Sequence, residues 1–191
     1  AGLAWDNLET CLRRLLVSFR SGLLGLGLAT ASALLTLPAR AMDPADAALE
    51  AASALGVVVI QGADCGGPRQ LATYNMGANV LCLSKALDLD PQKRARVIQH
   101  ELVHVVQDCL DGLGTPTSLT LAEGLRSSGQ LSGEQVNGFF LQHLRKQGNL
   151  NHVVASTAQL PMESRQREFE AYALQADPAM VAHLLKSTCT L

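Results

Sequence analysis

Two histidines and a glutamate lie close together near the middle of this sequence. His100 and His104 are four residues apart, and Glu101 directly follows the first of them. In an α-helix this separation places both imidazole rings on one face, one turn apart, so their nitrogens can bind the same metal ion. Glu101 would then lie where its carboxylate can take a proton from a water molecule. This spacing favours metal-assisted hydrolysis, with one Zn²⁺ per chain.

The residues around the motif predict the helix that this spacing requires. Asp90-Pro91 is typical of a helix start, and Gly112 is typical of a helix end, so we expect a helix from Pro91 to about Leu110. Gln107 and Asp108 fall on the side of the histidines. There Asp108 would either orient His104 or cap the end of the helix. The opposite side is apolar and would face the core, and its members are Ile98, Leu102, Val105, Val106 and Cys109.

The run from His100 to Gln107 resembles the metal helix of the zincin metallopeptidases. This resemblance implies hydrolysis of peptide bonds in a peptide or protein substrate, with Glu101 as the general base. It also implies an edge strand that precedes the helix and holds the substrate, for which Asn79–Ser84 is well placed. The metzincin branch requires a histidine six residues after His104. That position is Leu110, so the sequence does not fit the metzincin branch.

The gluzincin branch instead takes its third metal ligand from a glutamate on a later helix. The segment 167–173 resembles that helix and offers two candidates, Glu168 and Glu170. With Glu168 as ligand, Tyr172 stands where the family often has an acid and can still support the site by a hydrogen bond. Glu170 lies nearer the apolar side, where a buried carboxylate needs a partner such as a metal. Both remain open, and His143 and His152 are more remote candidates.

A second function is also compatible with these residues. The histidine pair could belong to an exported zinc-binding module without catalytic activity. A structural zinc site has no use for a carboxylate at position 101 and is usually closed by four protein ligands. Glu101 is therefore the residue that separates the two hypotheses.

The first 41 residues have the pattern of a secretory signal peptide. Arg13, Arg14 and Arg20 precede an apolar stretch over 23–37, and Ala39-Arg40-Ala41 supplies the small residues of a cleavage site. We expect a mature chain of residues 42–191 that forms a single zincin-like domain and has no stable membrane association. The alternative is an uncleaved anchor, although the stretch is short for a span of about 20 residues.

Four cysteines follow the predicted cleavage site. An even number of cysteines in an exported domain indicates two disulfides, and three pairings are possible. Cys65 and Cys82 flank a turn rich in glycine and proline, which favours that pair. Cys109 would then bind Cys189 and tie the chain end to the metal helix. Four buried thiols are the alternative.

Composition and hydrophobic patterning set the expected fold. The net charge is −2 and no basic run occurs, so the sequence has no electrostatic signature of nucleic-acid binding. We predict an α+β fold, with a small, mainly antiparallel sheet that places an edge strand over the zinc-binding helix, followed by a helical C-terminal part. The predicted strands are 57–60, 71–75 and 79–84. The other predicted helices are 44–55, 118–126, 132–147, 162–175 and 178–186.

Overall fold

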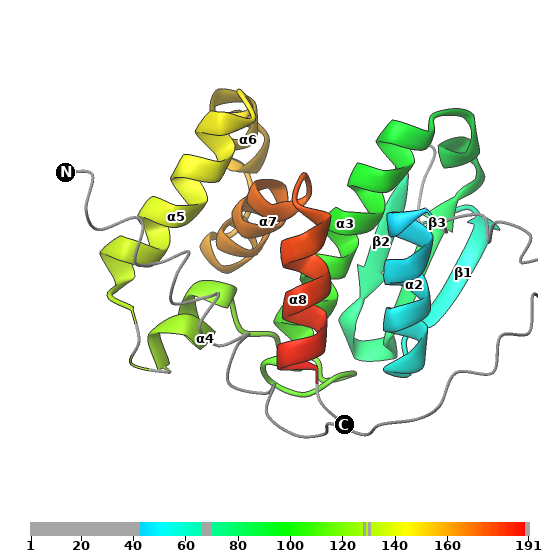
Figure 1. The fold of residues 1–191 in the computed structure, drawn as a ribbon, viewed down its shortest axis with the longest axis horizontal. Coiled ribbons are helices and arrows are strands. Elements are labelled where there is room, and N and C mark those ends of the chain that lie inside the picture. Colours follow the sequence, from blue (N-terminus) through cyan, green and yellow to red (C-terminus); the bar gives the residue numbers. More distant parts are fainter. Residues whose placement is uncertain (1–42, 66–69, 128, 130, 190–191) are drawn as a thin grey trace, which may run out of the picture. The chain divides into compact units, whose positions relative to one another are not determined.

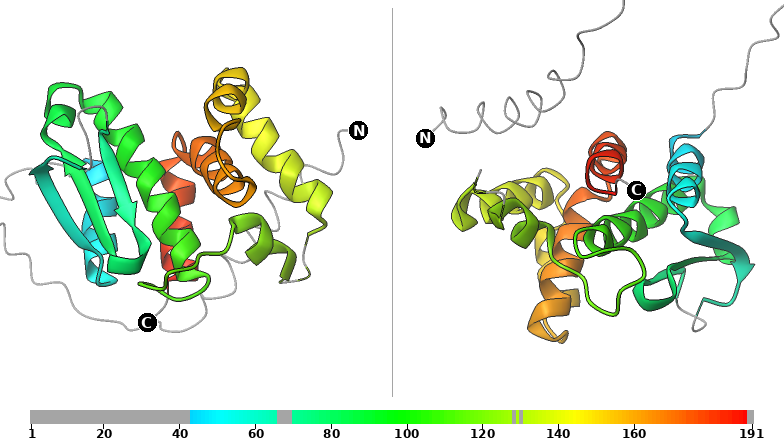
Figure 2. Two further views of the ribbon diagram at one scale, coloured as in Figure 1. Left: turned by 180° about the vertical axis from the view of Figure 1, so that it is seen from behind. Right: turned by 90° about the horizontal axis from the view of Figure 1, so that it is seen from below.

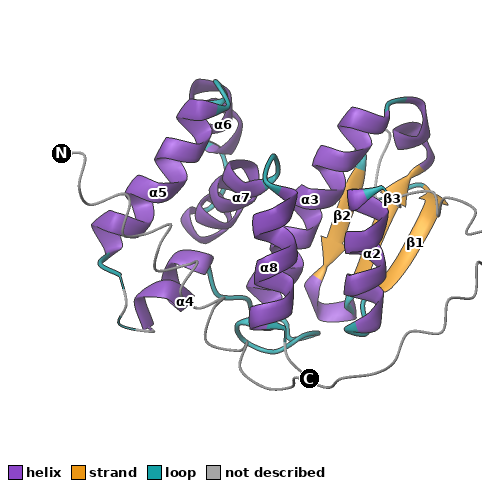
Figure 3. Cartoon of the chain, in the orientation of Figure 1, coloured by secondary structure: helices purple, strands orange, loops and turns teal. Residues whose placement is uncertain are grey.

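Seven α-helices, two short 3₁₀ helices and three strands make up the described part of the chain (Figures 1 and 3). A computed structural model describes residues 43–65, 70–127, 129 and 131–189. The elements are α2 (Pro44–Ala54), β1 (Val58–Ala63), β2 (Ala72–Asn75), η1 (Met76–Ala78), β3 (Val80–Ser84), η2 (Lys85–Leu89), α3 (Pro91–Cys109), α4 (Leu121–Ser127), α5 (Gly133–Lys146), α6 (Leu150–Thr157), α7 (Met162–Leu174) and α8 (Pro178–Thr188). The predicted α+β class and helical C-terminal part are confirmed. The predicted signal peptide, residues 1–41, lies outside the described residues.

The three strands form one mixed sheet in the order β1-β3-β2 (Figure 2). β3 is parallel to β1, with Val58 opposite Val80, and antiparallel to β2, with Tyr74 opposite Leu81. The prediction of a mainly antiparallel sheet is therefore corrected. Only η1 and Asn79 separate β2 from β3, and so short a connection suits an antiparallel pair. β1 takes the other edge of β3, and the chain returns through β2 before it reaches β3.

The strand predicted to edge the site, Asn79–Ser84, lies in the middle of the sheet instead. Because β3 is paired on both sides, it has no free edge for another strand. β2 is the edge strand next to α3. The prediction took the strand that precedes the helix in sequence, whereas the sheet order depends on pairings between distant segments.

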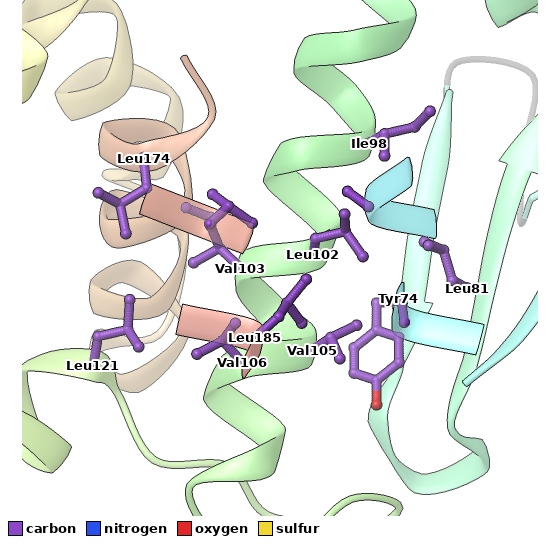
Figure 4. Packing of buried hydrophobic residues seen from close by; sticks show 14 of the residues in the cluster. Tyr74, Leu81, Ile98, Leu102, Val103, Val105, Val106, Leu121, Leu174 and Leu185 are labelled. Carbon is purple, nitrogen blue, oxygen red and sulfur yellow. The ribbon is translucent and has the colours of Figure 1, made fainter. Parts of the chain in front are cut away.

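α3 packs against the sheet on one side and against α7 and α8 on the other. Asp90 caps it by accepting a hydrogen bond from the backbone N–H of Lys93, as the Asp-Pro pair predicted. Ile98, Leu102 and Val105 point towards the sheet, while Val103 and Val106 point towards α7 and α8 (Figure 4). All five side chains are fully buried. Each such burial contributes about 1.5–3 kcal/mol, so α3 is held firmly on two sides.

Two disulfides close the fold, with the predicted pairings. Cys65 is joined to Cys82 in β3, and Cys109 at the end of α3 is joined to Cys189 just after α8. Disulfides form and persist in oxidising compartments, so both bridges fit an exported protein. Among the described helices, none combines the length and apolar character that a membrane span requires.

α6 is a helix that the sequence analysis missed. Asn149 precedes it without making a side-chain cap, and the helix is rich in β-branched residues, which have modest helix propensity. Val153 and Thr157 are buried, and α6 packs against α7. Tertiary packing rather than local preference therefore stabilises this helix.

Candidate metal centre

α3 and α7 bring two histidines and one glutamate together. The rings of His100 and His104 lie one turn apart on α3, with centroids 5.0 Å from each other. Glu168 on α7 faces both, with Oε2 at 3.2 Å from His100 Nε2 and Oε1 at 3.4 Å from His104 Nε2. One ligand atom from each residue lies within 4.8 Å of the other two, so the three side chains form a group that can hold a metal ion.

The geometry and chemistry of this group fit zinc. A tetrahedral zinc ion with bonds of about 2.0–2.1 Å separates its ligand atoms by about 3.4 Å, close to both nitrogen–oxygen distances. Two imidazole nitrogens and one carboxylate oxygen are also a common zinc donor set. Three protein ligands would leave a fourth position open for a small molecule.

Glu170, the alternative third ligand, does not face the histidines. Its side chain is fully buried, and its carboxylate accepts hydrogen bonds from the backbone N–H groups of Leu121 at 2.7 Å and Ala122 at 3.0 Å. The sequence analysis reasoned correctly that a carboxylate on this side of α7 needs a partner. The partners are amides of the backbone and of two glutamine side chains rather than a metal, which leaves Glu168 as the candidate third ligand.

Electrostatic interactions among the three candidate ligands shift the pKa values of Glu168 and His104. Burial alone would raise the pKa of Glu168, but hydrogen bonds and charge interactions with His100 and His104 hold that pKa far below its usual range. Burial alone would likewise lower the pKa of His104. The hydrogen bond to Glu168 and the charges of Glu101 and Glu168 outweigh burial and raise it. Because a metal ligand must be deprotonated, the raised pKa of His104 means that a metal ion would compete with a proton for this ring.

Glu101 lies between the metal group and the sheet. Its side chain is buried, and Oε2 accepts a hydrogen bond of 2.9 Å from the backbone N–H of Tyr74 in β2. No described residue forms a hydrogen bond with Oε1. The negative charge of Glu101 contributes to the raised pKa of His104, and Glu101 directly follows His100 on α3. One oxygen is thus fixed by the edge strand, while the other has no hydrogen-bond partner among the described residues.

Asp108 does not orient His104, contrary to one of the two roles predicted for it. Its Oδ2 atom accepts hydrogen bonds from the hydroxyl of Tyr74 at 2.6 Å and from the backbone N–H of Gly114 at 3.0 Å. Burial first, and then the neighbouring carboxylate, raise the pKa of the Tyr74 phenol well above its ordinary value. Asp108 therefore joins the end of α3 to the sheet and to the following loop.

Tyr172 lies against the metal group, on the side of His100. The two rings meet edge to face, with centroids 4.7 Å apart. Burial and the charges of Glu168 and Glu101 raise the pKa of the phenol. Tyr172 thus lies beside the metal group, where a supporting residue was predicted. Its contact with the candidate ligand His100 is a ring contact, however, and not the predicted hydrogen bond.

The histidine partner that the sequence analysis missed is Gln107. Its Oε1 atom lies 2.8 Å from Nδ1 of His104, the ring nitrogen that points away from Glu168. The available signal was its position three residues after His104 on the polar side of the helix. His143, a remote candidate ligand, instead packs on Phe139 and hydrogen-bonds to its carbonyl oxygen.

Comparisons with protein-family models, with curated proteins and with solved structures find no match to this chain. The assignment of a function therefore depends on the residues and geometry of the site itself.

Proposed function

We propose that this chain is an exported zinc-dependent peptidase of the zincin type, with His100, His104 and Glu168 as metal ligands. The observation that carries the proposal is the position of Glu101. A carboxylate beside the metal group has one oxygen held by the edge strand and the other without a protein partner. A site that only stored or structurally bound zinc would have no need of this arrangement.

Each residue has a distinct part in the proposed reaction. Zinc, when bound, acts as a Lewis acid towards a water molecule and a peptide carbonyl. Glu101 accepts the proton of that water and then donates it to the leaving amine. The hydrogen bond from the Tyr74 N–H fixes the carboxylate of Glu101 during both transfers.

The edge strand β2 supports a peptide or protein as the substrate. An extended peptide can add to the open edge of a sheet through backbone hydrogen bonds. Leu71, just before β2, accepts a hydrogen bond from Ser84 on β3, so the alternate residues Ala72 and Tyr74 direct their backbone groups away from β3. The N–H of Tyr74 is already bonded to Glu101, so a bound peptide would lie next to the general base.

The Glu101→Gln variant tests this function. Glutamine keeps the size of the side chain and an oxygen for the Tyr74 N–H, but it cannot accept a proton. Zinc content should remain about one per chain, while hydrolysis should fall by roughly 10²–10⁴-fold. The assay is cleavage of a quenched peptide library by zinc-loaded mature protein, with a chelator-treated sample beside it. Glu163→Gln, which changes an exposed carboxylate in the first turn of α7, is the matched control and should cleave normally.

The alternative, a zinc-binding module without catalysis, predicts a different result. Wild-type protein would then bind zinc but cleave no peptide in the library, and Glu101→Gln would change nothing measurable. Equal cleavage by wild type and Glu101→Gln would also refute the role of Glu101 as the general base.

A further inference from the structure

Two buried polar side chains, Gln107 and Glu170, connect His104 to the start of α4. We propose that both are positioning residues of the metal centre. In this proposal they determine which nitrogen of His104 carries the proton and hold the ring in its metal-binding orientation. The inference rests on the proposed function in one respect only, which is that His104 binds zinc through Nε2.

The orientation of the Gln107 side-chain amide follows from its partners. Its Nε2 atom lies 3.2 Å from the backbone carbonyl oxygen of Arg167 and 2.9 Å from Oε2 of Glu170. A carbonyl oxygen can only accept a hydrogen bond, so the amide nitrogen must point towards α7. The reverse orientation would place the amide oxygen of a fully buried side chain against the Arg167 oxygen, with no donor between them.

The orientation of Gln107 in turn fixes the proton on His104. With its nitrogen directed at α7, Gln107 presents Oε1 to Nδ1 of His104 at 2.8 Å. An amide oxygen cannot donate, so Nδ1 must carry the hydrogen. In the neutral ring Nε2 then keeps its lone pair, and it is Nε2 that lies in the metal group. The hydrogen bond also restrains rotation of the His104 ring about the bond that joins it to Cβ.

Glu170 extends the same connection to α4. Its carboxylate accepts the backbone N–H groups of Leu121 and Ala122, together with side-chain amides of Gln107 and Gln166. Residues 121 and 122 are the first two of α4. One buried carboxylate therefore holds both the start of α4 and the amide that orients His104. The loop between α3 and α4 and the metal ligand are linked by direct hydrogen bonds.

Hydrogen-bond partners of metal-binding histidines typically change metal affinity by about 10–100-fold when removed. Gln107→Met removes all three side-chain hydrogen bonds of Gln107 while keeping the length of the side chain. We expect its zinc affinity, measured by competition with a chelator, to fall by about 10–100-fold relative to wild type. Wild-type affinity in Gln107→Met would overturn the proposal.

Gln99 offers a matched control on the same helix. It is also a buried glutamine, but neither its side-chain oxygen nor its nitrogen has a hydrogen-bond partner in the described structure. Gln99→Met makes the same chemical change at a position without a link to His104, so its zinc affinity should equal that of wild type. An equal loss in Gln99→Met and Gln107→Met would show a general effect on folding, and would also overturn the proposal.

A second measurement observes the proton itself and needs no zinc. In zinc-free wild-type protein labelled with ¹⁵N-histidine, long-range ¹H–¹⁵N spectra should show a proton on Nδ1 of His104 that exchanges slowly with solvent. Gln107→Met should lose this protection, while the signals of His100 stay unchanged. A bare or freely exchanging Nδ1 in wild type would overturn the inference, even if the variant does not fold. If wild type binds no zinc, the proposed function fails, whereas this measurement still decides the inference.

Discussion

The two disulfides should differ in how much they stabilise the fold. The bridge from Cys109 to Cys189 spans 80 residues, and the bridge from Cys65 to Cys82 spans 17. In the chain-entropy model, closing these loops removes freedom from the unfolded state worth about 4.5 and about 3.1 kcal/mol, respectively, at 25 °C. Replacing each pair by alanines should therefore destabilise the protein by unequal amounts, with the longer bridge costing about 1.4 kcal/mol more.

Equilibrium urea unfolding of zinc-free wild type and of the two double-alanine variants measures this difference. The zinc-free form is the appropriate sample because bound zinc would add its own stabilisation to the folded state. Comparison of the m-values checks that all three proteins expose similar surface on unfolding. The reasoning is refuted if loss of the Cys65–Cys82 bridge costs as much free energy as loss of the Cys109–Cys189 bridge, or more.

Three further predictions concern the site. Glu168→Gln removes a candidate ligand, so it should weaken zinc binding by more than about 100-fold, the upper effect of losing a supporting hydrogen bond. The control Glu163→Gln, at an exposed position, should bind zinc as wild type does when affinity is measured by competition with a chelator. In zinc-free protein the pair of His104 and Glu168 should stabilise the fold most between about pH 4.5 and 6.5, because the pKa of Glu168 is lowered from 4.5 and that of His104 is raised from 6.5. The contribution of Glu168 is lost as the pH falls through its lowered pKa, and that of His104 is lost as the pH rises through its raised pKa. Urea unfolding at pH values below, within and above this range should show a maximum for wild type and a flatter profile for Glu168→Gln, and identical profiles would contradict the prediction. Tyr74→Phe removes a hydrogen bond of 2.6 Å to the buried Asp108 and should lower the free energy of unfolding by about 1–3 kcal/mol, and an unchanged urea midpoint would disprove that role.

The sequence predicted the features of this site that depend on neighbouring residues. The spacing of His100, Glu101 and His104 has a definite meaning once the segment is helical, and the Asp-Pro start made the helix itself predictable. The third ligand was narrowed to Glu168 or Glu170, with the position of Tyr172 favouring Glu168 and the apolar side of α7 favouring Glu170. Each of these inferences uses the period of a helix, which is a local property.

Features that depend on contacts between distant segments were not predictable in the same way. Gln107 and Asp108 are consecutive and both lie on the polar side of α3, so the helical period cannot decide which one meets His104. The choice depends on Arg167 and Glu170, which lie 60 and 63 residues further along the chain. The order of the strands has a similar cause, because the pairing of β1 with β3 skips over β2.

The edge-to-face contact between Tyr172 and His100 places an intrinsic fluorophore against the candidate metal group. The chain has two tyrosines and one tryptophan, and that tryptophan, Trp5, belongs to the predicted signal peptide. A mature chain would therefore emit only from Tyr74, whose amide holds Glu101, and from Tyr172, whose ring touches a candidate ligand. Without a tryptophan in the mature chain, tyrosine emission would not be lost by energy transfer to an indole. Metal binding beside the Tyr172 ring should therefore change the tyrosine emission of unlabelled protein, and Tyr172→Phe would separate the signal of one ring from that of the other.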